Sequence, residues 1–118
     1  MRALVILPVM LLVASLGCTP EAFCGKRQEC DRQLAADDQA VCVASYKADI
    51  DALRANSEPE CHKLADAILA LDACRASLSC DDFQEADLGQ KCDDPSDSYR
   101  VALDQTRPNG ISVCSTIH

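Results

Sequence analysis

The chain has 118 residues, nine of them cysteine, and a formal net charge of −8 from 19 acidic and 11 basic side chains. This acidity argues against binding to nucleic acid and against electrostatic attraction to anionic lipid. The length suits one domain. With no Trp, two Phe and two Tyr, the core is short of large side chains, and we expect disulfides to supply much of the stability.

The first 17 residues have the pattern of a secretory signal peptide. Arg2 is followed by an uncharged, apolar stretch from Ala3 to Leu16 that ends among small residues. The stretch is shorter than the roughly 20 apolar residues of a membrane-spanning helix. We therefore expect residues 1–17 to be removed and residues 18–118 to form one exported, cysteine-rich helical domain. Without Arg2, its formal charge is −9.

The end of the leader, Ala14-Ser15-Leu16-Gly17-Cys18, resembles the lipobox of bacterial lipoprotein precursors. In that motif a small residue precedes a cysteine that is acylated and becomes the mature N-terminus. Ser15 stands where Leu is more usual. The resemblance implies that Cys18 is lipidated. It also implies sorting to the outer membrane, because Thr19 is not the Asp that retains lipoproteins at the inner membrane. The alternative is ordinary cleavage after Ser15 or Gly17, which leaves Cys18 as a thiol.

The odd number of cysteines supports lipidation. Beyond Cys18 there are eight: Cys24, Cys30, Cys42, Cys61, Cys74, Cys80, Cys92 and Cys114. Eight cysteines can all pair, whereas a ninth would remain as a free thiol in an oxidising compartment. We therefore interpret the eight as a disulfide scaffold and Cys18 as the lipid attachment point.

Helices are predicted along most of the mature chain. The first begins at Thr19-Pro20-Glu21, with Pro in its first turn, and would carry Phe23, Arg27 and Leu34. The second runs from Asp38 to Asn56. The third begins at Ser57-Glu58-Pro59-Glu60, which has the pattern of a capping box. Apolar residues recur at helical spacing in both: Cys42, Tyr46, Ile50 and Leu53 in the second helix, and Cys61, Leu64, Ile68, Leu71, Cys74 and Leu78 in the third.

The very short turn between the second and third helices predicts an antiparallel αα-hairpin. With the turn near Ser57, Cys42 should lie opposite roughly positions 72–74 of the third helix, so Cys42–Cys74 is the preferred disulfide. A second bridge, Cys80–Cys92, would close the segment 81–91. Eight cysteines allow 105 connectivities, and the remaining pairings stay open.

The C-terminal part contains one more predicted helix. It starts at Asp94-Pro95-Ser96-Asp97 and carries Tyr99, Val101 and Leu103. Residues 107–110, Arg-Pro-Asn-Gly, indicate a turn, and the alternating residues 111–117 are expected to be extended and held by Cys114. The predicted fold is therefore all-α, a small disulfide-stapled helical domain built on an antiparallel αα-hairpin.

The cysteine spacing suggests an internal two-fold repeat. Cys24-x5-Cys30-x11-Cys42 is matched, 50 residues later, by Cys74-x5-Cys80-x11-Cys92. An Asp follows the second cysteine of each set, and a fourth cysteine completes each half. Residues 24–61 and 74–114 are thus candidate pseudo-repeats, although coincidence is the alternative where cysteines are so dense.

No pattern indicates a catalytic or metal-ligating site. The closest cysteines are six residues apart, unlike the C-x2–4-C pairs of zinc sites or the C-x-x-C of redox proteins. His62 and His118 lie in no recognisable motif, and His62 is expected to be an exposed helix residue. The acidic segments 81–87 and 93–97 do not fit a calcium-binding loop. We interpret Asp81, Asp82 and Asp94 as helix N-caps and as carboxylates that favour the helix dipoles.

The stretch Cys61-x12-Cys74-Arg-Ala-Ser-Leu-Ser-Cys80-Asp-Asp-Phe behind a lipobox resembles the small cysteine-rich, helical lipoproteins of some Gram-negative bacteria. The resemblance covers the leader and most of the mature chain. It implies a helical fold at the outer membrane, on its periplasmic or surface face, and provides no active site to carry over.

We therefore expect a non-enzymatic lipoprotein of the cell envelope, with no cofactor and no bound metal or nucleic acid. Its partners would be the membrane, through the lipid on Cys18, and an envelope protein bound by a structural or protein-binding module. One alternative is an inhibitor or sensor of an envelope enzyme that presents the segment 81–91. Another alternative is a minimal enzyme or a metal-binding or redox protein.

Overall fold

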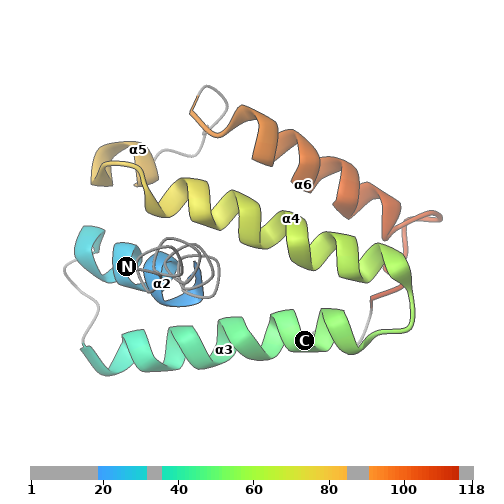
Figure 1. Cartoon of the computed structure of the whole chain (residues 1–118), viewed down its shortest axis with the longest axis horizontal. Helices are drawn as coiled ribbons and strands as arrows, with labels where there is room; N and C mark the ends of the chain where they lie inside the picture. The colour runs from blue at the N-terminus through green and yellow to red at the C-terminus, as the bar shows by residue number, and fades with distance from the viewer. Residues whose placement is uncertain (1–18, 32–35, 85–90, 115–118) are drawn as a thin grey trace, which may run out of the picture.

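A computed structural model describes residues 19–31, 36–84 and 91–114. These residues form helices and no strand, which confirms the all-α prediction (Figure 1). The helices are α2 (Thr19–Cys30), α3 (Ala36–Ala55), α4 (Pro59–Ala76), α5 (Cys80–Gln84) and α6 (Asp93–Gln105). The predicted helices therefore form within a few residues of their expected boundaries. Leu34, which was assigned to the first helix, lies outside the described residues.

The long helix α4 occupies the centre of the molecule (Figure 1). It packs against α6 on one side and against α3 and α2 on the other. The helices α3 and α4 run in opposite directions from a short turn, as the predicted hairpin requires, but they diverge away from that turn. The helix α2 packs against both of them and against the short helix α5. It therefore fills the open end of the hairpin.

The core is made of small and medium-sized side chains. Its buried members are Ile50, Leu53, Cys61, Leu64, Ala65, Ala67, Ala102 and Cys114. Three of them are alanine, which allows helices to approach closely but contributes little apolar area. Tyr46 and Tyr99 pack against this cluster only partly buried. The disulfide between Cys61 and Cys114 lies inside the core, where it joins the start of α4 to the end of the described chain.

The turn between α3 and α4 is shaped by Asn56 and not by the predicted capping box. Glu58 is the N-cap of α4 and makes no side-chain capping bond. The Asn56 Oδ1 atom accepts a hydrogen bond from the Glu58 backbone N–H at 2.9 Å, as in an Asx turn. His62, which is exposed as expected, donates from Nε2 to the Asn56 carbonyl oxygen at 2.6 Å. His62 lies in the first turn of α4, and its side chain thus stabilises the connection between α3 and α4.

The chain after α6 folds back on the core. Thr106 is fully buried, and its hydroxyl donates to the Leu103 carbonyl oxygen at 2.6 Å. The Thr106 carbonyl oxygen in turn accepts from the Val113 N–H at 2.7 Å. Residues 111–114 therefore form bends and turns, and the expected extended conformation is wrong for them, because this return bond and the Cys61–Cys114 disulfide pull the chain inward. Residues 115–118 lie outside the described residues.

All eight cysteines of the predicted scaffold form disulfides. The pairs are Cys24–Cys42, Cys30–Cys80, Cys61–Cys114 and Cys74–Cys92. The predicted pairs Cys42–Cys74 and Cys80–Cys92 are therefore both wrong.

The position of α2 explains the difference. At the open end of the hairpin α2 separates Cys42 on α3 from Cys74 on α4, and its own Cys24 bonds to Cys42. Cys74 bonds instead to Cys92, just before α6, which packs along α4. Because α5 packs against α2, Cys80 is directed to Cys30 and away from Cys92.

The disulfide pattern has the symmetry of the proposed repeat. The first and third cysteines pair within each half, as Cys24–Cys42 and Cys74–Cys92, each with a sequence separation of 18 residues. The second cysteines of the two halves bond to each other, and so do the fourth. The helices α3 and α6 also end 50 residues apart. The bonding is thus unchanged when the halves are exchanged.

We predict that the native protein contains these four linkages. Digestion without reduction, followed by peptide mass spectrometry, should recover peptides joined through Cys24–Cys42, Cys30–Cys80, Cys61–Cys114 and Cys74–Cys92. The same digest after reduction serves as the control, since every linked peptide should then separate. Recovery of a Cys42–Cys74 peptide would contradict the position of α2.

Candidate functional site

The acidic residues that the sequence singled out lie at helix starts. Asp81 and Asp82 are in the first turn of α5, and Asp93 and Asp94 are in the first turn of α6. There they favour the helix dipoles, as expected. The predicted N-caps are wrong, because Cys92 is the N-cap of α6 and the Ser79 hydroxyl accepts from the Asp82 N–H at the start of α5. Within residues 19–31, 36–84 and 91–114, no three His, Cys, Asp or Glu side chains gather closely enough to hold a metal ion. Cys18 and His118 lie outside these ranges.

A polar cluster that the sequence analysis missed lies at the open end of the hairpin. The Tyr46 hydroxyl on α3 donates a hydrogen bond to Oδ2 of Asp72 on α4 at 2.6 Å. Asp72 is 8% exposed, so this carboxyl is almost fully removed from water. Its other oxygen lies 3.7 Å from the guanidinium of Arg75, one helical turn further along α4. The cluster therefore joins two helices through a buried carboxylate.

Two aromatic rings from other helices complete the cluster. The Arg75 guanidinium lies 5.1 Å from the ring centroid of Phe23 on α2 and 5.0 Å from that of Phe83 on α5. These are distances of cation–π contacts. The Phe23 ring also lies 5.8 Å from Tyr46 and 5.7 Å from Phe83 in tilted arrangements, which aromatic pairs favour. Side chains from α2, α3, α4 and α5 thus meet around one arginine, whose Nε atom is buried without a hydrogen-bond partner.

Burial governs the protonation of this cluster. Burial raises the pKa of Asp72, while the Tyr46 hydrogen bond and the Arg75 charge act in the opposite direction. Burial, together with the hydrogen bond to Asp72, raises the pKa of Tyr46 well above its usual range. The phenol proton therefore stays on Tyr46 as a hydrogen-bond donor. The Tyr46 hydroxyl and the Asp72 carboxyl thus satisfy one another, which is the arrangement of a structural contact between α3 and α4.

A depression of about 280 Å³ opens beside the cluster. Its lining includes Arg27, Asp31, Arg75 and Gln84. Arg75 also pairs with Asp72, and the Gln84 amide donates to the Cys30 carbonyl oxygen at 2.7 Å. The Gln84 amide thus supports the packing of α5 against α2.

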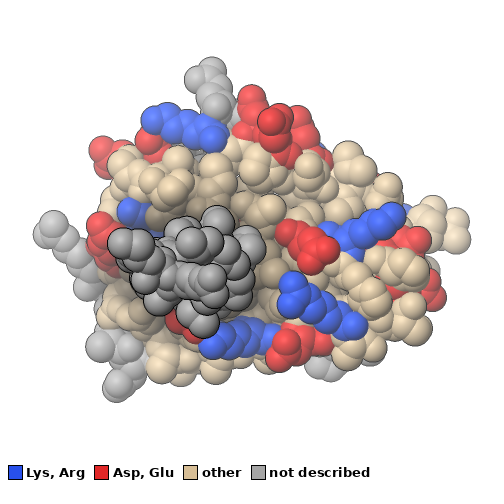
Figure 2. Space-filling model, viewed as in Figure 1, with Lys and Arg blue, Asp and Glu red and all other residues tan. Residues whose placement is uncertain are grey.

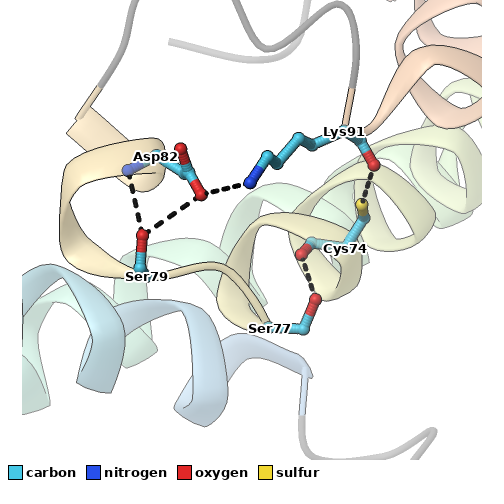
Figure 3. Close-up of polar contacts among 5 residues, drawn as sticks. All are labelled: Cys74, Ser77, Ser79, Asp82 and Lys91. Carbon is cyan, nitrogen blue, oxygen red and sulfur yellow. Dashed lines mark hydrogen bonds and ion pairs between the residues drawn. The ribbon is translucent and has the colours of Figure 1, made fainter.

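A second polar network closes the base of the segment 85–90 (Figure 3). The Ser79 hydroxyl accepts a hydrogen bond from the Asp82 N–H at 3.3 Å, and the Asp82 carboxylate lies 3.2 Å from the same hydroxyl. Ser79 therefore caps α5. Lys91 donates from Nζ to Asp82 at 2.8 Å, and this bond lowers the pKa of Asp82. The ion pair holds together the two sides of the segment, whose structure lies outside the described residues.

The disulfide Cys74–Cys92 lies beside this network. The Cys74 sulfur is 3.5 Å from the Lys91 carbonyl oxygen. Because a disulfide sulfur carries no proton, this is a packing contact and not a hydrogen bond. With Cys30–Cys80 on the other side, covalent bonds and an ion pair fix both ends of the segment.

Charges of opposite sign are interspersed on the face shown in Figure 2, where Lys and Arg lie next to Asp and Glu. Exposed ion pairs include Glu21–Lys47, Arg54–Asp66, Asp82–Lys91 and Asp97–Arg100. Such pairs contribute on the order of 0–1 kcal/mol each. Their distribution gives that face no patch of one sign to recognise a polyanion.

Comparison with protein-family models, with curated proteins and with solved structures finds no match to this chain. The helices of the described ranges include none that is both long and apolar enough to cross a membrane.

We predict that Tyr46→Phe destabilises the protein by about 1–3 kcal/mol, because the buried Asp72 carboxyl loses its hydroxyl donor. Chemical denaturation monitored by circular dichroism measures the free energy of unfolding. The matched control is Tyr99→Phe, at the partly buried tyrosine of α6, which should change it by no more than about 0.5 kcal/mol. Equal effects of the two substitutions would contradict the role of the Tyr46–Asp72 bond.

We also predict an unusual pH dependence from Asp72. Because burial raises its pKa, the folded state binds this proton more tightly than the unfolded state. The contribution of Asp72 to the free energy of unfolding is therefore greatest at low pH. It falls as the pH rises above about 3.9, the usual carboxyl value, until the folded carboxyl is ionised. The stability of the native protein relative to Asp72→Asn should accordingly decline over this range.

The control for that measurement is Asp82→Asn. The Lys91 bond lowers the pKa of Asp82, so its contribution should be present above the usual carboxyl pKa and be lost as the pH falls. As the pH rises, the stability of the native protein relative to Asp72→Asn should therefore fall, whereas its stability relative to Asp82→Asn should increase. A difference for Asp72→Asn that increases with pH would show that ion pairing with Arg75 outweighs burial.

Proposed function

We propose that this protein is a lipoprotein of the bacterial cell envelope, acylated on Cys18 after removal of residues 1–17. The supporting observation is the complete pairing of the other cysteines. Four disulfides use eight of the nine cysteines. No cysteine of the scaffold therefore remains to form a disulfide with Cys18. The ninth cysteine stands at the lipobox position, where its sulfur would carry the lipid.

The domain on this anchor acts as a non-enzymatic structural or protein-binding module. Its buried polar groups support this part of the proposal, because Tyr46, Asp72 and Arg75 contact one another and the adjacent rings. They join four helices and leave little side-chain chemistry directed to a ligand. The partners are the outer membrane, through the acyl chains, and a further protein of the envelope.

An inhibitor or sensor of an envelope enzyme is the second candidate. It is favoured by the fixed ends of the segment 85–90, which lie between the Cys30–Cys80 and Cys74–Cys92 disulfides and next to the Asp82–Lys91 ion pair. A recognition segment whose two ends are held by disulfides loses less conformational entropy when it binds a partner. Replacing residues 85–90 by Gly and Ser at equal length should abolish enzyme binding if this function holds, while membrane attachment is retained.

The lipoprotein proposal is tested by the intact mass of the protein purified from membranes, with and without thiol alkylation. We expect an N-terminus at Cys18, the added mass of acyl chains, and no alkylatable thiol. The matched control, Cys18→Ser, should lack the acyl mass and should no longer partition into the detergent phase. Its four disulfides should still form, since none involves residue 18.

An unacylated N-terminus with an alkylatable thiol would overturn the proposal. Cys18 would then be a free cysteine, and the eight-cysteine scaffold would belong to an exported protein without an anchor.

A further inference from the structure

The first helix of the domain leaves no linker after the proposed lipid attachment. The helix α2 begins at Thr19, the next residue after Cys18 in the sequence. Adjacent Cα atoms are about 3.8 Å apart, whereas a flexible Gly/Ser linker of ten residues has a root-mean-square length of about 17 Å. If α2 is rigidly attached to the domain, the lipid is attached directly to the folded frame.

The contacts of α2 fix it to the domain from its first turn onward. Glu21 pairs with Lys47 of α3 at 2.6 Å, and the Phe23 ring packs against rings of α3 and α5. Two disulfides then bind the helix, at Cys24 to α3 and at Cys30 to α5. Since Cys24 is only six residues beyond Cys18, even complete unwinding of the first turn would give a reach of about 20 Å at most.

The charges at the start of α2 are compatible with a nearby lipid surface. Charges interact appreciably within a Debye length of about 8 Å at physiological ionic strength. Here Lys47 accompanies Glu21, and their hydrogen bond lowers the pKa of Glu21, so the carboxylate stays ionised beside its ammonium partner. At this end of the acidic domain, the negative charge of Glu21 is therefore balanced by the positive charge of Lys47 next to the lipid headgroups.

We infer that the domain lies directly on the bilayer, with the exposed Glu21 and Ala22 of α2 and Lys47 of α3 facing the lipid headgroups, and does not extend into the aqueous space on a tether. The inference rests on the proposed acylation of Cys18. It restricts the protein partner to one located at the membrane surface. The residues after α6, at the opposite end of the molecule from α2 (Figure 1), are then the part furthest from the lipid.

The experiment uses the acylated full-length mature protein in phosphatidylcholine vesicles that contain headgroup spin-labelled lipid. A genetically encoded azide carries a fluorophore at exposed Ala22 in the first turn of α2, or at exposed Asn109 after α6. This avoids adding a cysteine. We expect several-fold stronger quenching at Ala22 than at Asn109. A ten-residue Gly/Ser insertion between Cys18 and Thr19 keeps the anchor and the fold, and should reduce quenching at Ala22 to near the value at Asn109.

Equal quenching at Ala22 and Asn109 in the acylated protein without the insertion would overturn this inference and leave the lipoprotein proposal standing. So would quenching at Ala22 that the insertion does not change. Failure of the lipoprotein proposal gives a different result: the protein purified from membranes lacks acyl mass, does not remain with the vesicles, and is quenched at neither position. That result would overturn both.

Discussion

The insertion of α2 between α3 and α4 is the constraint on which most other contacts depend. A closed hairpin of α3 and α4 would leave this small domain with few large apolar side chains in contact. By entering the open end, α2 brings Phe23 to Tyr46 and Phe83 and Cys24 to Cys42. The same insertion encloses Asp72 among packed helices. The Tyr46 hydroxyl and Arg75 therefore satisfy a carboxylate that would otherwise be buried at a cost of several kcal/mol.

The disulfide pattern relates the two halves of the chain in a way that supports duplication. Each half closes one local bond, and two further bonds join equivalent cysteines across the halves. About a quarter of the 105 pairings open to eight cysteines share this exchange symmetry. The symmetry therefore adds to the matched spacings and does not replace them. The halves have nevertheless diverged, since the buried Asp72 and the three rings around Arg75 have no counterpart set in equivalent positions.

The helices could be predicted because their signals are local. Apolar residues at helical spacing and the short turn after α3 required no knowledge of distant residues. The number of cysteines likewise indicated four bonds. The pairing could not be predicted, because a short turn by itself implies a closed hairpin, and only the packing of α2 separates Cys42 from Cys74. One signal of the polar cluster was present in the sequence. Asp72 follows Leu64 and Ile68 at four-residue intervals, which places a carboxylate on the apolar side of α4. Tyr46 is likewise on the predicted apolar side of its helix, but its pairing with Asp72 and the contacts of Arg75 with Phe23 and Phe83 depend on tertiary packing.

The connectivity has a consequence for how the protein matures. No native disulfide joins two cysteines that are consecutive in the sequence. An oxidase that joins cysteines in their order along the sequence would link Cys24 to Cys30 and would produce no native bond. Cys61 must also wait for Cys114, near the end of the chain, to arrive. Early bonds would have to be exchanged through mixed disulfides, which takes seconds to hours and depends on the available catalyst. Accumulation of this small domain should therefore depend on a disulfide isomerase as well as on an oxidase.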